Sequence, residues 1–242
     1  MPGFRVHITG STAVGAGYAA AAWSVGGMPP STCALAGGLC AVAGMLPDLD
    51  SGPGVPLRES VAFAAAVVPM LMIHRFEQAG MTLESMILAG AAIYLAIRFG
   101  LSWVLTKHAT HRGMYHSLPA AAVVGQIAFL AFGAEDPLRR YFIASAVVLG
   151  YLTHLVLDEI WSVKLGQFGP KFKTSFGTAF KFYGGEAWSN LLTYVLVIAL
   201  GVLAAGDAAW SERTLHMRQH TRQQMEQAAR SMQAPAPWNY RR

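Results

Sequence analysis

RYFIASAVVLGYLTHLVLDEIW (residues 140–161) combines the two features that decide how this chain folds. Residues 140–157 are largely apolar, and a helix of about 20 such residues is long enough to cross a membrane. His154 and Asp158 come at the end of this run, so on a helix their side chains, four positions apart, point the same way. The stretch predicts a membrane-spanning helix that presents an imidazole and a carboxylate at one boundary of the membrane, a pair suited to a divalent metal. Alone, the pair is also explained as a hydrogen-bonded helix end.

The whole chain has the composition of a membrane protein. Of its 242 residues, 54% are hydrophobic and 13% are charged, whereas soluble domains carry about 25% charged residues. Abundant glycine and alanine within the apolar runs let helices pack closely in lipid. The net charge of +5 comes from the loops and the C-terminal tail. It favours anionic lipid headgroups as partners, and we expect no nucleic-acid partner.

Seven apolar segments are candidate membrane spans. They are residues 12–28, 31–46, 58–73, 84–106, 117–133, 140–157 and 188–206. The predicted fold class is therefore all-α, a multi-pass transmembrane helical bundle of about seven spans. We expect one domain over residues 1–210, with its N-terminal segment retained rather than cleaved as a signal peptide, and a polar C-terminal tail over 211–242.

The alternation of these spans gathers ligand-type side chains on one side of the membrane. Residues 1–11, 47–57, 107–116 and 158–187 fall on the same side as the N-terminus. These segments hold His7, Asp48, Asp50, His108, His111, Arg112, His116 and Asp158, and His154 lies one helical turn inside the boundary. Incidental polar residues would scatter over both faces. The grouping therefore indicates a common site, provided that the number of spans has the right parity.

GMLPDLDSGPG (residues 44–54) places two carboxylates directly after a span. Asp48 and Asp50 are one residue apart, and the following glycines and prolines force irregular backbone, so the pair can reach one ion or bridge two. The alternative is a polar turn in which Asp48 caps the next segment.

KHATHRGMYHSLP (residues 107–119) lies where one span ends and another begins. Gly113 permits a sharp turn, so that His111 and His116 can point at one centre. The guanidinium of Arg112 is always charged, and its planar set of N–H donors suits a phosphate or a carboxylate. Ser117 is suited to cap the following helix or to hydrogen-bond a ligand. The alternative is a set of solvated loop histidines.

These motifs resemble a known family. A histidine before the first span, Leu-Pro-Asp-Leu-Asp (46–50), His-Arg-Gly-x-x-His-Ser (111–117) and Gly-Tyr-Leu-x-His-Leu-x-Leu-Asp (150–158) are similar to those of the LexA-regulated, membrane-bound metal-dependent hydrolases, or YdjM-like proteins. The resemblance implies a multi-pass inner-membrane protein with a divalent metal site. By position, its ligands would be His7, Asp48, Asp50, His111, His116, His154 and Asp158. Tyr115 departs from the pattern, because a small hydroxyl residue is expected there.

Residues 158–187 carry a phenylalanine at every fourth position from 168 to 180, interleaved with lysines. If helical, this segment presents an aromatic stripe with cationic flanks and lies in the headgroup region beside the proposed metal, where it would gate lateral entry of a lipid substrate. Gly169, Pro170 and Gly177 weaken a continuous helix, and the alternative is a packed loop that covers the bundle.

The sequence thus predicts a membrane-embedded metal-dependent hydrolase acting on a phosphoester or another lipid-linked ester. One or two divalent ions, zinc by expectation, would lower the pKa of bound water toward ~7. The ligands expected first are Asp50, His111, His154 and Asp158. Asp48, His116 and His7 would complete a second metal site or act as general base.

Arg112 would bind an anionic substrate group or stabilise charge in the transition state. Two alternatives stay open. One is a metal-ion or small-solute transporter that uses the same His/Asp site. The other is a scaffold with a structural metal, although structural zinc sites are usually rich in cysteine and no cysteine falls near this one.

Overall fold

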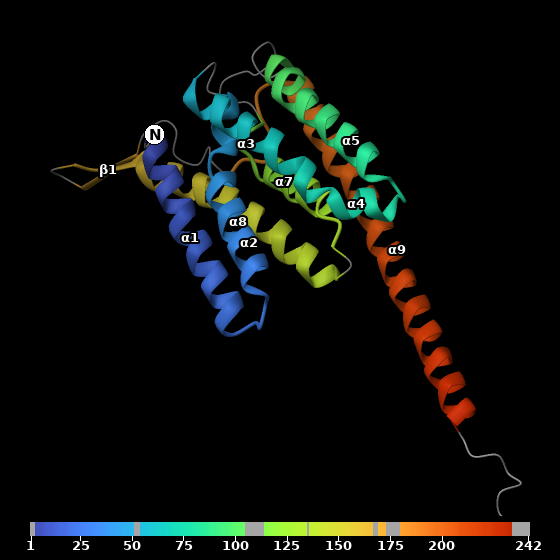
Figure 1. Ribbon diagram of the computed structural model, residues 1–242. Helices are drawn as coiled ribbons and strands as arrows, with labels where there is room; N and C mark the ends of the chain where they lie inside the picture. The colour runs from blue at the N-terminus through green and yellow to red at the C-terminus, as the bar shows by residue number, and fades with distance from the viewer. Residues whose placement is uncertain are drawn as a thin grey trace, which may run out of the picture. The chain divides into compact units, whose positions relative to one another are not determined.

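The structure is a computed structural model that describes residues 3–50, 54–104, 114–134, 136–166, 169–172 and 180–233. Its elements are α1 (Phe4–Ser24), α2 (Pro30–Ala43), the 3₁₀ helix η1 (Leu46–Asp50), α3 (Val55–Leu71), α4 (Ile73–Gln78), α5 (Leu83–Leu95), the π-helix η2 (Ala96–Leu101), α7 (Leu118–Ala131), α8 (Pro137–Ser162), β1 (Val163–Gly166), β2 (Gly169–Phe172) and α9 (Ala187–Gln233) (Figure 1). The chain forms two compact units, Met1–Ala204 and Ala205–Arg242. The second unit carries the polar continuation of α9, in which Arg222 pairs with Glu226.

The prediction of an all-α membrane bundle is confirmed. Every predicted span coincides largely with helix. Among the described residues, the helices long and apolar enough to cross a membrane are Leu57–Gln78, Leu83–Val104, Pro137–Ser162 and Ala187–Asp207, and Pro30–Ala43 and Leu118–Ala131 are shorter apolar helices. A total of seven crossings stays a prediction.

The core of the first unit is built by α1, α2, α7 and α8. Helix α8 packs against the other three, and α1 packs along α2 (Figure 1). Glycines allow the closest approaches: a Cβ at Gly15 would lie 2.6 Å from the carbonyl oxygen of Gly37, and a Cβ at Gly150 would overlap the carbonyl of Cys40. Such small residues let helix backbones touch in lipid, where there is no hydrophobic driving force between helices. Cys33 and Cys40 are free and buried in this core, as packing residues.

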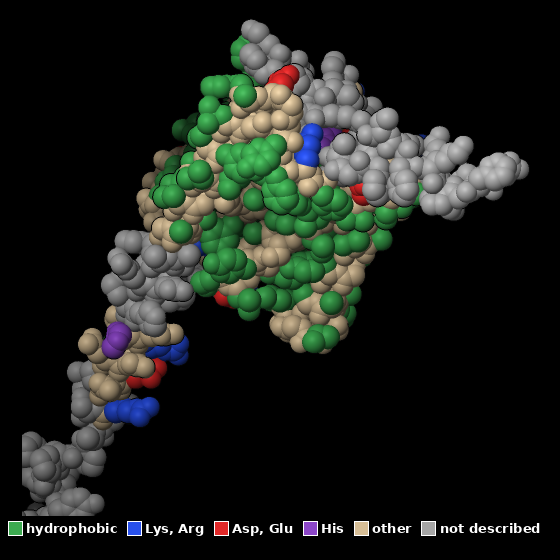
Figure 2. All heavy atoms as spheres, turned by 180° about the vertical axis from the view of Figure 1, so that it is seen from behind, with side chains coloured by type: hydrophobic (Ala, Val, Ile, Leu, Met, Phe, Trp, Pro, Cys, Tyr) green, Lys and Arg blue, Asp and Glu red, His purple; other side chains and the backbone are tan. Residues whose placement is uncertain are grey.

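A second group of helices lies beside this core. Helix α3 packs against α5, η2 and η1. Helix α5 has no buried residue, and Leu88, for example, is 71% exposed. Figure 2 shows hydrophobic side chains spread over the described surface of the face that it presents. An apolar outer surface of this kind is expected where the surroundings are lipid rather than water.

Helix α1 begins at Phe4, well before the predicted span at residue 12. The polar residues near its start do not prevent this, because the hydroxyls of Ser11 and Thr12 donate to carbonyls one helical turn earlier, those of His7 and Ile8. His7 is therefore a buried helical residue and not part of a loop.

The segment after Asp158 differs from the predicted interfacial helix. Helix α8 continues to Ser162, and residues 163–166 then pair with 169–172 as an antiparallel hairpin, with Gly166 opposite Gly169. Glycine at the turn and Pro170, which has no N–H to donate, disfavour a helix here. The predicted helix is therefore wrong for residues 163–166 and 169–172. Of the proposed phenylalanine stripe, Phe168 and Phe176 lie outside the described residues.

Candidate metal centre

Helix α8 contributes two side chains to a buried polar cluster. His154 is fully buried, and its Nδ1 lies 2.7 Å from the carbonyl oxygen of Gly44, at the end of α2. A carbonyl only accepts, so Nδ1 donates the hydrogen and the lone pair of the ring is on Nε2. Asp158 follows one helical turn later and is also buried. The backbone of Gly44 thus fixes both the tautomer and the direction of the His154 ring.

Two short segments bring Asp48 and His116 to the same place. Asp48 lies in the single 3₁₀ turn of η1, directly after α2. His116 immediately precedes the N-cap of α7, where the hydroxyl of Ser117 accepts from the amide of Ala120 and donates to the carbonyl of Met114. Capping of α7 by Ser117, one of the two predicted roles, is therefore confirmed, and the cap holds the backbone on which His116 sits.

Helix α1 supplies His7 from the opposite side of His154. The two imidazole rings stack with their centroids 3.7 Å apart and at 14° to each other. Nε2 of His7 lies 3.3 Å from Oδ1 of Asp158. The hydroxyl of Ser11, one turn further on, lies 2.7 Å from the carbonyl of Ala41 in α2 and so ties α1 to α2 beside the cluster.

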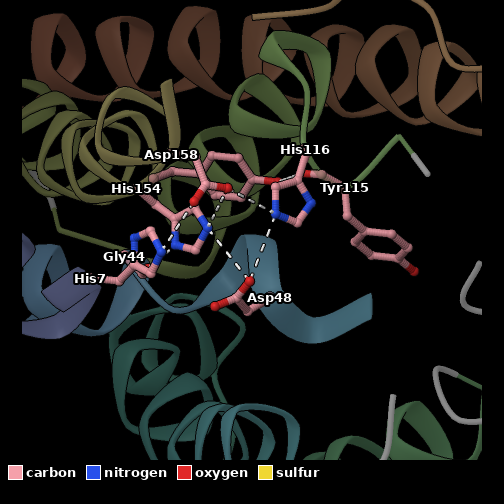
Figure 3. A network of polar contacts seen from close by, with 8 residues as sticks. His7, Gly44, Asp48, Tyr115, His116, His154 and Asp158 are labelled. Atoms are coloured by element: carbon pink, nitrogen blue, oxygen red, sulfur yellow. Dashed lines mark hydrogen bonds and ion pairs between the residues drawn. The ribbon is translucent and has the colours of Figure 1, made fainter. Parts of the chain in front are cut away.

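Two imidazole nitrogens in this cluster each lie at nearly the same distance from two carboxylate oxygens. Nε2 of His154 lies 3.6 Å from Oδ1 of Asp48 and 3.7 Å from Oδ2 of Asp158. Nε2 of His116 lies 3.8 Å from each of the same two oxygens. Figure 3 shows these four side chains, from η1, the start of α7 and α8, pointing toward one another.

The electrostatics of the cluster favour negative carboxylates. Burial by itself raises the pKa of the Asp48 carboxyl, but its contacts with three neighbouring histidines outweigh this, and its pKa lies below the ordinary value. Asp48 is therefore ionised at neutral pH. Nε2 of His154 is buried and forms no hydrogen bond within the described part of the chain. A buried lone pair that faces two carboxylates is costly unless a positive ion or a proton lies between them.

The structure brings together five of the residues that the sequence singled out, namely His7, Asp48, His116, His154 and Asp158. Asp50 ends η1, but its side chain is not described. His111 and Arg112 lie in 105–113, outside the described residues. The side chain of Tyr115 points away from the cluster (Figure 3), and it packs against an apolar group that includes Leu57 and Val61. The phenol of Tyr115 therefore does not face the cluster.

Sequence reasoning did not identify two residues that support the cluster. Gly44 acts through its backbone carbonyl, so no side-chain pattern marks it, although it opens the Asp48 motif. Ser11 acts through a contact between helices. Its only signal is a hydroxyl one turn after His7 on the same helical face.

Comparison with known proteins places the chain in a family. The model of the YdjM inner membrane protein family matches residues 1–221. Neither the curated proteins nor the solved structures contain a match to the chain. Regulation by LexA stays a prediction. Together with the long apolar helices, the family match identifies this chain as a member of the YdjM inner membrane protein family and an integral protein of the inner membrane.

Proposed function

We propose that this protein is a membrane-embedded metal-dependent hydrolase that cleaves a phosphoester or another lipid-linked ester. The observation that carries the proposal is the arrangement of Nε2 of His116 and His154 around one carboxylate oxygen each of Asp48 and Asp158, with separations of 3.6–3.8 Å.

These separations fit a shared metal ion better than direct hydrogen bonds. An N–H···O hydrogen bond has a donor–acceptor distance of about 2.7–3.2 Å, which is shorter than every one of the four. Two ligands that bind a tetrahedral zinc at about 2.1 Å lie about 3.4 Å apart. The four measured nitrogen–oxygen separations are about 0.2–0.4 Å longer than that value. Imidazole and carboxylate are also the donors expected for zinc in a site without thiolates.

The described residues favour one ion rather than two. Two overlapping groups have suitable spacing, His7 with His154 and Asp158, and Asp48 with His116 and His154. Both contain His154, and its single free lone pair cannot bind two ions at once. A second ion would therefore need ligands from residues such as Asp50 and His111.

Burial separates the roles of these residues. The side chains of His116, His154 and Asp158 are at most 6% exposed, and we propose that they bind the ion. The proposed ion is zinc. Asp48 is 20% exposed and ionised, so it is placed to take the proton from an attacking water. Nε2 of His7 lies 3.3 Å from the other oxygen of Asp158, and this contact is proposed to keep that carboxylate turned toward the site.

When bound, the ion supplies Lewis-acid activation of water and stabilises negative charge on the ester oxygens. The oxygen of water bonds to phosphorus or carbonyl carbon, the proton of water passes to Asp48, and the bond to the leaving alkoxide breaks. Asp48 then gives the proton to the alkoxide, which leaves as the alcohol. Asp158 lies one turn before the end of α8, so the bond to be cleaved would lie near the membrane boundary, at the depth of a lipid ester. Arg112 is proposed to bind the anionic group of the substrate.

The test uses the purified full-length protein. Metal content is measured by elemental analysis, and turnover of a short-chain phosphoester and of diacyl phospholipids is measured before and after chelation. We expect about one zinc per chain, and turnover that stops on chelation and returns with zinc. His154→Ala should lose both metal and turnover, whereas His74→Ala, a histidine paired with Glu77 outside the cluster, should keep both. Full metal in His154→Ala would disprove the site. Metal-dependent flux into liposomes without turnover would favour the alternative, a transporter.

A further inference from the structure

A long apolar cavity of about 380 Å³ lies between α3 and the core helices. Its walls include Ser60, Ala64, Val67 and Leu71 of α3, facing Ala128 of α7 and Val147 of α8. The cavity exists because α3 packs its backbone against α5, η2 and η1, while side chains such as Phe63 and Val67 bridge to the core. We call this cavity the α3 groove.

One end of the α3 groove adjoins the candidate metal centre. Leu46 and Leu49 both line the groove, and they are the residues on either side of Pro47 and Asp48 in η1. In a 3₁₀ helix, residues three apart lie on the same side. The two leucines therefore face the groove together, while Asp48, on another side of the same turn, faces the histidines.

The length of the groove matches one leaflet of a membrane. Its α3 wall runs from Ser60 to Leu71, and eleven residues of helix rise about 16 Å. The hydrocarbon core of a bilayer is about 30 Å thick, so one leaflet contributes about 15 Å. The groove thus extends from the level of the candidate site to about the middle of the bilayer, as one acyl chain does.

The groove is also accessible from the side. Leu101 of η2 and Ile127 of α7 line it and are 41% and 44% exposed. Both residues lie within apolar membrane helices, where the surrounding solvent is acyl chains. A lipid chain can therefore enter laterally without crossing water.

Ser60 is a polar exception in this wall. It is 1% exposed, and within the described part of the chain its hydroxyl has no hydrogen-bond partner. A buried hydroxyl without a partner is costly, so a partner in the groove would relieve that cost. Ser60 stands at the end of the α3 wall nearest η1, and an acyl ester has its carbonyl at the corresponding point, between the headgroup and the chain.

We propose that the α3 groove binds one ester-linked acyl chain of a membrane glycerophospholipid, with the Ser60 hydroxyl donating to the ester carbonyl and the phosphoester headgroup at the candidate metal centre. The position of the headgroup rests on the proposed function, whereas binding of the chain does not. The substrate class is accordingly a diacyl phospholipid rather than a water-soluble phosphoester.

The test is photolabelling of the full-length protein in nanodiscs, with a phosphatidylglycerol that carries a diazirine midway along one acyl chain. We expect labelled peptides from α3 and α7. Ala64→Phe fills the groove and should lower labelling at least tenfold. Ala66→Phe is the matched control, because Ala66 is exposed on the other side of the same helix, and it should leave labelling unchanged. Ser60→Ala should weaken competition by unlabelled lipid about three- to tenfold.

An equal loss of labelling in Ala64→Phe and Ala66→Phe, or label found only in α5 and α9, would overturn the proposal. The lipid would then be bound nonspecifically at the outer surface of the protein. Cross-linking of residue 64 to a second copy or to another segment of this chain would also overturn it. If the unaltered zinc-loaded protein is labelled as expected but shows no phospholipid turnover, the groove is supported and only the hydrolase is refuted. Phospholipid hydrolysis that is unaffected by Ala64→Phe refutes the groove and leaves the hydrolase standing.

Discussion

The two carboxylates of the candidate metal centre should respond differently to the same substitution. Asp158→Asn and Asp48→Asn each replace a carboxylate by an amide of the same shape. Asp158 is almost fully buried and lies within 3.8 Å of Nε2 of both His116 and His154, so we assign it as a ligand. Asp48 has similar distances but is partly exposed, so we assign it as the proton acceptor.

The expected magnitudes follow from these roles. Structural zinc sites bind with an apparent free energy of about 10–16 kcal/mol; if three protein side chains and one water would hold the ion, each of the four ligands accounts for about 2.5–4 kcal/mol. Asp158→Asn should therefore weaken zinc binding by roughly 10²–10³-fold and abolish turnover at ordinary zinc concentrations. Asp48→Asn should change zinc affinity by less than about tenfold and lower kcat by roughly 10²–10⁴, the usual contribution of a general base.

The assay is zinc titration of the detergent-purified variants with a chelating indicator, together with turnover at saturating zinc. Asp136→Asn is the control. Its carboxylate accepts from the amide of Leu138 at the start of α8, far along the chain from the cluster, so this variant should keep its zinc affinity and lose only about 1 kcal/mol of stability. Equal loss of zinc in Asp48→Asn and Asp158→Asn would refute the division of roles, and zinc fully retained in Asp158→Asn would refute the site.

Three further results are expected. His7→Gln should weaken zinc binding by about 10- to 100-fold, as removal of a group that orients a ligand does, and an unchanged titration would rule out that role. The pH dependence of zinc binding between pH 7 and 5 should be the same in Asp48→Asn as in the unaltered protein, because Asp48, whose pKa lies below its ordinary value, stays ionised over this range; a difference between the two titrations would show that Asp48 takes up protons there. Gly150→Ala should destabilise the protein by about 1–3 kcal/mol in thermal unfolding, since its Cβ would overlap Cys40. Gly38→Ala, with open space around it, should be neutral or stabilising. Equal changes in the stability of the two variants would contradict the packing of α8 against α2.

Much of the architecture was determined by local sequence. Apolar runs separated by glycine, proline and charge predict the helices, because a backbone in lipid must satisfy its own hydrogen bonds. The spacing of His154 and Asp158 on one helix predicts their common direction, and the position of Ser117 predicts the cap of α7. The alternation of spans even predicts that His7, Asp48 and His116 lie on the same side as that pair.

Local sequence was less informative where polar groups are satisfied by distant partners. Helix α1 was expected to start later, since the sequence does not show that Ser11 can bond to carbonyls of both α1 and α2. The phenylalanine spacing after Asp158 suggested a helix, but residues 163–166 pair with 169–172 as antiparallel strands. In the first case a side-chain hydrogen bond to distant backbone, and in the second the pairing of two strands, outweighed the short-range pattern.

By itself, then, the sequence determined the membrane helices, the cap of α7 and the common direction of His154 and Asp158. Only the tertiary structure decided that Gly44 orients His154, that two imidazole nitrogens lie at nearly equal distances from two carboxylate oxygens, and that a groove separates α3 from the core helices. The reason is physical. Helical periodicity and apolar length are properties of neighbouring residues, whereas the distance between α2 and α8 depends on which glycines meet when the helices pack.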